Sequence, residues 1–368
     1  MEINKISIIG IGLIGGSLAK AFTQRTGIKD ITAVGRNREI LDRAVAEGTI
    51  TRGFTGLNEY VYNSDIIFIC TPVRTAVSYL TKLSGKVKPE CIITDVASTK
   101  GELSRAALSL QHKVRFIGGH PMTGSEKAGY GSSYAHLFEN AYYILTPGEN
   151  CEESDLQAMK QLVGSIGAIP IELDHEEHDL ITAVISHIPH IAAAALVNLA
   201  GDYDTGGVMK MLAAGGFRDM TRIASSDPEM WENILLSNRE KVLDVLSGYE
   251  NILSELRSAV KSGNSAQIKD FFLRAGNYRS TLRDSGKGLI EPIYELEVDM
   301  VDKPGAIGEV STLLGKNQLN IKNMNVINSR ENVRGCLKIT LAGRDDLTKA
   351  YSLLKNSGFK VFSNSANF

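Results

Sequence analysis

The chain has 368 residues, of which 40 are basic and 42 are acidic. This length exceeds what one ordinary hydrophobic core organises, so we expect two or three domains. The formal net charge of −2 offers no basic surface for nucleic acid, and any anion-binding site must be local. We find neither a signal peptide nor an apolar run of the roughly 18 residues that span a membrane, and we expect a soluble, cytoplasmic protein.

The cysteines show no CxxC spacing, and two of them lie in apolar runs that are typical of strands. We therefore expect reduced, structural thiols and no metal site. The four cysteines are Cys70, Cys91, Cys151 and Cys336.

A glycine-rich stretch near the N-terminus follows a short apolar run and leads into a helical pattern. In the sequence GIGLIGGS at 10–17, Gly10 permits a tight turn after a strand. Gly12 lets the backbone approach a pyrophosphate, and Gly15 lets the helix pack closely on the strand. The candidate nucleotide-binding residues are Gly10, Gly12, Leu13, Ile14 and Gly15.

Short apolar runs alternate with helical patterns through the first half of the chain. This alternation predicts an α/β fold, a doubly wound parallel sheet of the Rossmann type, over residues 1–173. The predicted strands are 5–9, 31–34, 66–70, 92–95, 115–117, 142–145 and 169–171.

Ligands of a doubly wound sheet bind beyond the carboxyl ends of its strands, so the residues after each strand are candidates. Thr71 and Pro72 follow the third predicted strand, Ser98 follows the fourth and His120 follows the fifth. An imidazole, with a pKa of about 6.5, can accept a proton from an alcohol while hydride leaves the same carbon. Ser98 could instead cap a helix and His120 could be a packed loop histidine. Two glycines before His120 and a proline after it favour a fixed, functional backbone.

Only helical patterns are evident from about residue 174 to 285. The run 180–199 is apolar on nearly every face, as in a helix buried in a bundle or between two subunits. We therefore expect an all-α substrate and dimerisation domain in a homodimer. A polar linker is predicted at 276–292, before the last domain.

Two pairs of residues in this helical part suggest binding. His187 and His190 lie three residues apart on one helical face, but no further ligands complete a zinc site. We expect one of them to donate a hydrogen bond to a substrate and the other to be structural. Arg218 and Arg222 are one helical turn apart and suit a carboxylate, although a solvated basic face beside Asp219 is the alternative.

Residues 293–368 return to a mixed pattern. Strands are predicted at 293–300, 320–327, 333–341 and 359–362, and helices at 307–315 and 347–356. This order is βαββαβ, the ferredoxin-like arrangement.

Together these motifs resemble the prephenate dehydrogenase family over essentially the whole chain. The resemblance rests on GIGLIGGS at 10–17, DVASTK at 95–100, GHPMTGSE at 119–126, SHIPH at 186–190 and GFRDMTRIASSDPEMW at 216–231. The C-terminal part, with DKPGAIGEV, resembles an ACT domain, a small-molecule sensing module that is often specific for amino acids.

The resemblance implies oxidative decarboxylation of prephenate to 4-hydroxyphenylpyruvate with reduction of a nicotinamide cofactor. It implies that His120 hydrogen-bonds the ring hydroxyl, with Ser98 beside it, and that Arg222 engages a carboxylate. Glu126 and Asp219 match acidic residues near the entrance. The candidate catalytic residues are thus His120 and Ser98, and the candidate substrate-binding residues are His190, Arg222, Glu126, Asp219, Trp231 and His187.

The end of the second predicted strand bears on the cofactor. An acidic residue there usually binds the ribose of NAD, but this chain has Arg36 and Asn37. Arg36 could neutralise a 2′-phosphate, while Asn37 can hydrogen-bond the ribose. Because family members with a fused ACT domain mostly use NAD, we expect NAD, with NADP as the alternative.

Two other functions remain open. Arogenate carries an amine where prephenate carries a keto group, and the motifs do not distinguish the two. A catalytically silent sensor of nucleotide and amino acid is disfavoured, because Ser98, His120, His190 and Arg222 occur together.

The predicted effector is tyrosine, the end product of the pathway, with phenylalanine or no effector as alternatives. Pro304 and Gly305 shape a loop whose amide groups can bind an amino-acid carboxylate. The candidate effector-binding residues are Asp302, Pro304, Gly305, Ala306 and Ile307, with Asn320 and Asn323 contributed across paired subunits.

Overall fold

The computed structural model describes residues 3–124, 127–284, 294–301, 303–327 and 334–362. The chain forms two compact units, which meet at residue 255 of the sequence. The first unit, residues 1–255, holds the larger sheet and most of the helical region, and the second holds the smaller sheet.

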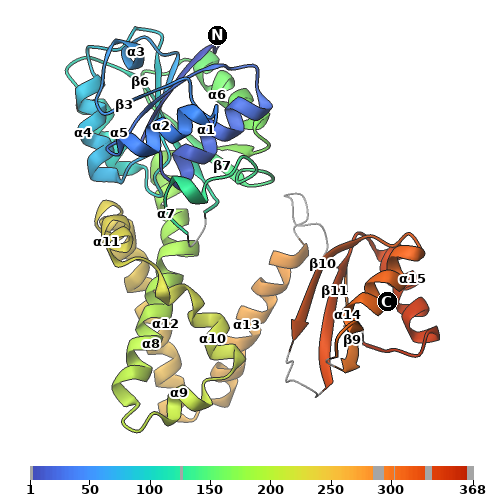
Figure 1. The fold of residues 1–368 in the computed structure, drawn as a ribbon. Coiled ribbons are helices and arrows are strands. Elements are labelled where there is room, and N and C mark those ends of the chain that lie inside the picture. Colours follow the sequence, from blue (N-terminus) through green and yellow to red (C-terminus); the bar gives the residue numbers. More distant parts are fainter. Residues whose placement is uncertain (1–2, 125–126, 285–293, 302, 328–333, 363–368) are drawn as a thin grey trace. The chain divides into compact units, whose positions relative to one another are not determined.

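An eight-stranded sheet organises the first unit, in the order β3-β2-β1-β4-β5-β6-β7-β8 (Figure 1). The strand order reverses between β1 and β4, which is where doubly wound sheets bind their ligands. The strands are β1 (Lys5–Ile9), β2 (Asp30–Val34), β3 (Arg52–Phe54), β4 (Ile66–Ile69), β5 (Ile92–Asp95), β6 (Arg115–Pro121), β7 (Tyr142–Pro147) and β8 (Ile169–Glu172).

The sheet differs from the prediction in two ways. Strand β3 was not predicted, because its three residues are too few to show an apolar alternation. Strand β7 runs antiparallel to β6, so the sheet is mixed rather than wholly parallel. A parallel pair needs a long crossover connection, usually a helix, whereas the described residues between β6 and β7 form just the short 3₁₀ turn η1 (Tyr130–Ser132).

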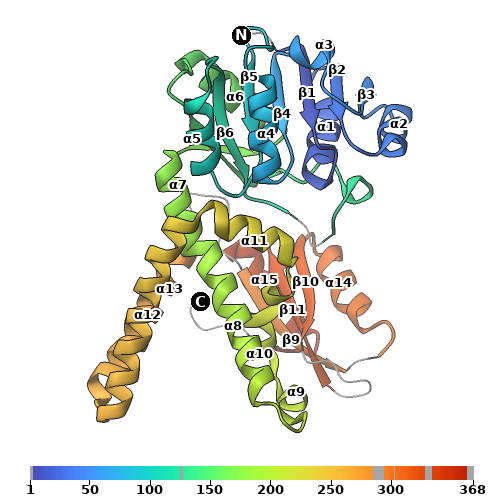
Figure 2. The same cartoon turned by 90° about the vertical axis from the view of Figure 1, so that its left-hand side faces the viewer.

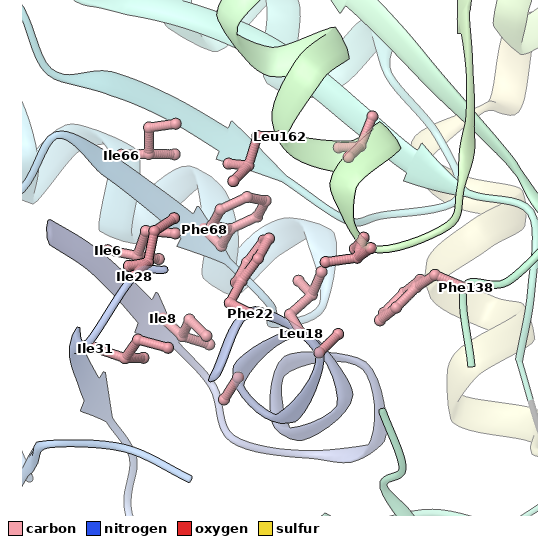
Figure 3. Close-up of a cluster of buried hydrophobic side chains, with 14 of the residues drawn as sticks. Ile6, Ile8, Leu18, Phe22, Ile28, Ile31, Ile66, Phe68, Phe138 and Leu162 are labelled. Atoms are coloured by element: carbon pink, nitrogen blue, oxygen red, sulfur yellow. The ribbon is translucent and has the colours of Figure 1, made fainter. Parts of the chain in front are cut away.

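Helices cover both faces of this sheet (Figures 1 and 2). Apolar side chains of α1, α2 and α6 pack in one cluster, of which Figure 3 shows Leu18 and Phe22 of α1 and Leu162 of α6. Those of α3, α4 and α5 pack in another. Their bounds are α1 (Leu13–Arg25), α2 (Arg38–Ala46), α3 (Glu59–Tyr62), α4 (Val73–Leu83), α5 (Gly101–Ser109) and α6 (Glu153–Ser165).

Strand β4 shows why the predicted strands read as continuous apolar runs. Ile66 and Phe68 point into the first cluster, whereas Ile67 and Ile69 point into the second. Successive side chains of a strand face opposite sides of the sheet, so a strand covered on both faces needs apolar residues throughout.

The helical part of the first unit begins with one continuous helix from His175 to Tyr203, and the predicted change from strands to helices is confirmed. It comprises α7 (His175–Thr182), the π-helical segment η2 (Ala183–His187) and α8 (Ile188–Tyr203). The elements that follow are α9 (Val208–Leu212), α10 (Gly215–Thr221), the 3₁₀ helix η3 (Arg222–Ser225), α11 (Pro228–Ser237) and α12 (Arg239–Ser262), which crosses the boundary between the units.

Within the described residues, the helix from His175 to Tyr203 is long and apolar enough to cross a membrane by length and composition alone, with a mean hydropathy of 1.9 over its most apolar 18-residue window. The expectation that no apolar run reaches this length is therefore wrong. Scattered polar residues such as Ser186 and Asn198 interrupt the run without adding charge, which is why an uninterrupted stretch is not evident. This single helix is weak evidence for a membrane, because a core helix of a soluble protein meets the same test.

In the second unit, α13 (Ser265–Asp284) occupies the first half of the predicted linker, so that prediction is wrong for residues 276–284. Gly276 costs a helix only about 1 kcal/mol, which neighbouring helix-forming residues can offset. The other half of the predicted linker, 285–292, lies outside the described residues.

The predicted βαββαβ order of the last domain is confirmed, with an antiparallel sheet in the order β10-β11-β9-β12. Leu296, Leu337 and Ile339 point from the sheet into the core that the two helices cover. The elements are β9 (Tyr294–Val301), α14 (Ala306–Lys316), β10 (Ile321–Ile327), β11 (Arg334–Leu341), α15 (Arg344–Asn356) and β12 (Lys360–Phe362).

Candidate functional site

The glycine-rich loop has the geometry that the sequence predicts. Gly10 has a φ of +98°, and a Cβ there would lie 2.3 Å from the carbonyl oxygen of Cys70. A Cβ on Gly15 would lie 2.0 Å from the carbonyl oxygen of Gly10, so the close packing of helix on strand requires glycine. Open space surrounds the position that a Cβ on Gly12 would take. Among the described residues, no side chain caps the N-terminus of α1, and its first backbone N–H groups suit a phosphate.

The loop after β4 lies beside this turn. A Cβ on Gly10 would meet the methyl group of Thr71 at 3.0 Å, and Pro72 is the N-cap of α4. The Thr71 hydroxyl is buried and makes no hydrogen bond within the described structure. A buried polar atom of this kind normally has a partner, so this hydroxyl suits a bound ligand. Leu13 and Ile14 form the first turn of α1.

Arg36 and Asn37 are exposed beyond the end of β2. The side-chain oxygen of Asn37 accepts a hydrogen bond from the backbone N–H of Ile40 at 3.2 Å and caps α2. Its amide nitrogen remains the group that can donate to a ribose hydroxyl.

His120 lies in β6, which aligns with the end of β5 on one side and with β7 on the other. A Cβ on Gly119 would be 2.5 Å from the carbonyl oxygen of Asp95, and one on Gly118 would be 2.3 Å from the Thr146 hydroxyl. Both positions need glycine, and the predicted fixed backbone before His120 is confirmed.

A buried ion pair holds the peptide that precedes His120. Lys100 and Asp95 are both fully buried and paired. The Lys100 ammonium also donates to the carbonyl oxygen of Gly119 at 2.6 Å, and the Gly119 N–H donates to Asp95 at 3.1 Å. The position of His120 therefore depends on these two charges.

Ser98 lies in the same loop and is partly buried. It does not cap the following helix: the N-cap of α5 is Lys100, which makes no capping bond through its side chain. The carboxylate of Asp179 in α7 caps α5 instead. It accepts hydrogen bonds from the backbone N–H groups of Lys100 at 2.7 Å and Gly101 at 2.8 Å. The capping alternative for Ser98 is thus excluded.

His120 contacts a second histidine from the helical region. Its Nδ1 lies 2.8 Å from Nε2 of His178, and Nδ1 of His178 lies 2.8 Å from Asp179. The pKa of His120 is well below its usual value, first because the ring is buried, and then because of the positive charge of Lys100 and the neighbouring His178 and His187. His120 is therefore neutral at neutral pH and can accept a proton.

The next two histidines lie at the end of the π-helical segment η2 and just beyond it. The N–H of Ile188 bonds to the carbonyl of Ala183, one residue further back than in an α-helix. Pro189 has no N–H and would clash with the carbonyl four residues before it, and the wider π turn accommodates it. His187 is the last residue of η2 and His190 lies in the first turn of α8, so the predicted spacing of three residues along one helix is kept.

The two histidines have different environments. His187 is buried, and the Asn238 amide donates to its Nδ1 at 3.3 Å. Burial lowers the pKa of His187 to about 4, so it is neutral. Nδ1 of His190 donates to the carbonyl oxygen of Ser186 at 2.9 Å, which leaves its Nε2 as the ring nitrogen that could meet a ligand.

The only tryptophan of the chain, Trp231 of α11, covers His190. The two ring centroids are 4.0 Å apart, and the His187 ring meets Trp231 edge-on at 6.0 Å. The Trp231 indole N–H is buried without a partner in the described structure. An unpaired buried donor between two histidines suits a ligand oxygen.

Arg218 and Asp219 belong to α10, whereas Arg222 begins the separate 3₁₀ helix η3, which packs against α8. The single helical turn expected between the arginines is therefore broken. Arg222 and Asp219 are both exposed, and Glu126 lies outside the described residues.

The predicted effector residues lie in the second unit. Gly305 has a φ of +90° and is the N-cap of α14, after the exposed Pro304. Ala306 is buried and Ile307 is exposed. Asn320 and Asn323 are exposed at and beside β10, and Asp302 lies outside the described residues.

Comparison with known proteins gives three matching segments. The nucleotide-binding domain of prephenate dehydrogenase matches residues 18–172, its dimerization domain matches 174–273 and the ACT domain matches 294–358. The prephenate dehydrogenase of Bacillus subtilis is 37% identical over 348 residues, which cover 94% of each chain. The chain belongs to the prephenate dehydrogenase family. The prephenate dehydrogenase of Lactococcus lactis is 35% identical and covers 96% of this chain and 98% of its own.

Solved structures of the family share this fold. Prephenate dehydrogenase from Aquifex aeolicus, in complex with hydroxyphenyl propionate and NAD+, gives a TM-score of 0.70 at 30% identity, covering 77% of this chain and 99% of that chain. Arogenate dehydrogenase from Synechocystis gives a TM-score of 0.69 at 30% identity, covering 76% and 99%. The sequence-based assignment to the prephenate dehydrogenase family with an ACT domain is confirmed.

Membership of the prephenate dehydrogenase family gives the apolar helix a context other than a membrane, because this helix lies in the segment that matches the dimerization domain. Only 28% of its most apolar window is buried in the single chain. Large apolar side chains such as Val184, Ile185 and Leu199 are exposed along it.

The sequence reasoning missed His178, Asp179 and Lys100, which surround His120. The adjacent His178-Asp179 pair at the start of a helical run was a visible signal, since a carboxylate next to a histidine can orient its ring. Lys100 was part of a quoted motif, but its burial depends on β6 and could not be deduced locally.

Proposed function

We propose that this protein catalyses the NAD-dependent oxidative decarboxylation of prephenate to 4-hydroxyphenylpyruvate. The observation that carries the proposal is the position of His120, a neutral imidazole at the ligand-binding edge of a nucleotide-binding sheet. Family membership over 94% of the chain supports the same reaction.

The loop of Gly10, Gly12 and Gly15 and the unpaired Thr71 hydroxyl fit a dinucleotide, and these residues would hold its phosphates and ribose. Bound nicotinamide supplies the acceptor for hydride. NAD is favoured over NADP, since the structure from Aquifex aeolicus was solved with NAD+. Arg36 is exposed and could neutralise the 2′-phosphate of NADP. If the protein uses NADP, Arg36→Ala should lower kcat/KM with that cofactor.

The chemistry assigned to His120 is a temporary removal of one proton. As hydride leaves the ring carbon, the hydroxyl proton passes to His120 and the hydroxyl becomes a carbonyl. When the ring carboxylate leaves as carbon dioxide, its electron pair flows to this carbonyl oxygen and the ring becomes aromatic. The phenolate oxygen then takes the proton back, so the overall reaction releases no proton.

The decisive experiment measures nicotinamide reduction with prephenate and with arogenate, each with NAD and with NADP. Prephenate with NAD should give the highest kcat/KM. Arogenate is the second candidate because the Synechocystis arogenate dehydrogenase is as similar in structure as the prephenate enzyme. Absence of turnover with both substrates would reject the proposal in favour of a silent sensor.

Arg222 is the proposed partner of a substrate carboxylate. Loss of a charge-assisted pair costs about 2–4 kcal/mol, so Arg222→Ala should raise the KM for prephenate by about 30-fold or more. Arg218→Ala, which removes an exposed arginine of α10, is the matched control and should leave KM within about twofold. If both variants have the KM of the wild type, Arg222 belongs to a solvated basic surface and does not bind the substrate carboxylate.

The family assignment also supports a homodimer formed by the helical segment, in the cytoplasm. Exposed apolar residues on a helix of this length need cover, and a second copy provides it.

The proposed substrate site beside His120 also includes His187, His190 and Trp231. Ser98, Asp219 and Glu126 are further candidates.

Tyrosine is the proposed effector of the ACT domain. A cavity of about 260 Å³ lies beside the predicted loop and is lined by Lys303, Glu309 and Asp299, charges of both signs that suit a free amino acid. Inhibition requires that tyrosine bind the less active arrangement more tightly.

Gly305 tests this regulation. Its φ of +90° is unfavourable for a β-branched residue, so Gly305→Val should distort the loop and weaken inhibition by tyrosine at least about tenfold while basal kcat is largely kept. Gly315→Ala, inside α14, is the control and should retain inhibition. Undiminished inhibition in a folded Gly305→Val variant would move the tyrosine site away from this loop.

A further inference from the structure

The contact between His120 and His178 is part of a continuous chain of hydrogen bonds. Asp179 bonds Nδ1 of His178 at 2.8 Å, and Nε2 of His178 bonds Nδ1 of His120 at 2.8 Å. His178 is fully buried and Asp179 is 4% exposed. The chain therefore runs from the interior of the first unit to the proposed base, shielded from water.

The donors and acceptors in this chain have a fixed direction. Burial would raise the pKa of Asp179, but hydrogen bonds from His178 and from the backbone N–H groups of Gly101 and Lys100 lower it below its usual value. Asp179 is thus a carboxylate and can only accept, so Nδ1 of His178 donates. Nε2 of neutral His178 then accepts, and Nδ1 of His120 donates to it. The lone pair of His120 is left on Nε2, where a base needs it.

We propose that His178 and Asp179 are positioning residues that fix the tautomer of His120 and hold the substrate's hydroxyl proton until decarboxylation returns it. The inference rests on the proposed function and deepens it. In the forward step the hydroxyl proton binds Nε2 of His120, and the Nδ1 proton of His120 moves to Nε2 of His178. His178 becomes an imidazolium that donates to the Asp179 carboxylate. The reverse movement delivers one proton to the phenolate oxygen, so protons balance.

The charges around the pair explain why the carboxylate matters. Burial lowers the pKa of both histidines, and the Lys100 ammonium lowers both further. Asp179 and Asp95 oppose this effect on His178, and His187 adds to it on His120. Without Asp179, a proton taken by the pair would be held in an apolar, positively charged environment.

Two variants of His178 separate positioning from proton transfer. The amide of His178→Gln can accept from His120 and donate to Asp179, but it cannot become a cation. We expect His178→Gln to lower kcat about tenfold and His178→Ala about 100-fold, each with KM for prephenate within about twofold. His175→Gln is the matched control. His175 also lies on α7 but takes no part in the hydrogen bonds that join Asp179, His178 and His120, so this variant should keep kcat within about twofold.

Nitrogen-15 NMR of histidine-labelled protein provides a readout that does not depend on activity. In the wild type, His120 and His178 should each carry the proton on Nδ1, and His178→Ala should leave His120 as a mixture of tautomers. If the wild type fails to oxidise prephenate, the proposed function is rejected. The tautomers of His120 and His178 seen by NMR would still test the proposed hydrogen bonds from Asp179 to His120. An active wild type in which both His178 variants keep kcat, or raise only KM, would overturn the inference and leave the proposed function standing.

Discussion

Replacing His120 with asparagine should lower kcat with prephenate by about 10²-fold or more and change KM much less. Asparagine can keep a hydrogen bond toward His178, so the neighbouring structure should persist. It cannot take the hydroxyl proton, and the barrier to hydride removal rises because a cationic oxygen would develop instead of a carbonyl. Steady-state kinetics at saturating NAD measure the effect.

The pH profile gives the same prediction a second measurement. Since the pKa of His120 lies below its usual value of about 6.5, the imidazole is neutral and active at neutral pH. The value of kcat/KM should be level near neutrality and should fall only as the pH drops through this lowered pKa. The acid limb should disappear in His120→Asn. His136→Asn, an exposed histidine elsewhere in the first unit, is the control, and near-normal turnover in folded His120→Asn would end the assignment.

Replacing Lys100 with methionine should lower the free energy of unfolding by about 3–5 kcal/mol, because it leaves the buried Asp95 carboxylate without its cation. The carboxylate keeps the N–H donors of Ala97 and Gly119, which cannot neutralise its charge. Urea unfolding followed by Trp231 fluorescence measures the loss in the first unit, since this is the only tryptophan of the chain.

Two further variants test the electrostatic cause of this loss. Arg38→Met removes an exposed ion pair with Asp42 and should cost no more than about 1 kcal/mol. Asp95→Asn combined with Lys100→Met removes both charges and should recover part of the stability lost in Lys100→Met. A Lys100→Met protein as stable as Arg38→Met would show that the buried pair contributes little.

Lys100→Met should also reduce turnover in the protein that remains folded. Its ammonium binds the carbonyl oxygen of Gly119, the residue before His120. Losing this anchor allows the base to move relative to the substrate, and small displacements of catalytic groups slow a reaction strongly. The activity loss should appear in kcat at temperatures where circular dichroism shows native structure.

The amino-acid sequence determined the parts of this protein that depend on short-range patterns. Glycines at 10, 12 and 15 between an apolar run and a helix predicted the nucleotide-binding turn, because close backbone approach leaves no room for a Cβ at Gly10 and Gly15. The βαββαβ order of the last domain also followed from local periodicity and turn residues. Membership of the prephenate dehydrogenase family was evident from motifs spread along the chain.

Only the tertiary structure decided which residues surround the proposed base. His178 and Asp179 are more than fifty residues from His120 in sequence, and His178 reaches it because α7 packs its first turns against the loop after β5. The antiparallel β7 and the π turn before Pro189 likewise depend on how segments pack or compensate for a missing N–H. Local sequence carries propensities and spacing, but burial, pairing and the direction of a hydrogen-bonded chain depend on contacts between distant segments. That is why the sequence identified His120 and the structure identified the residues that orient it.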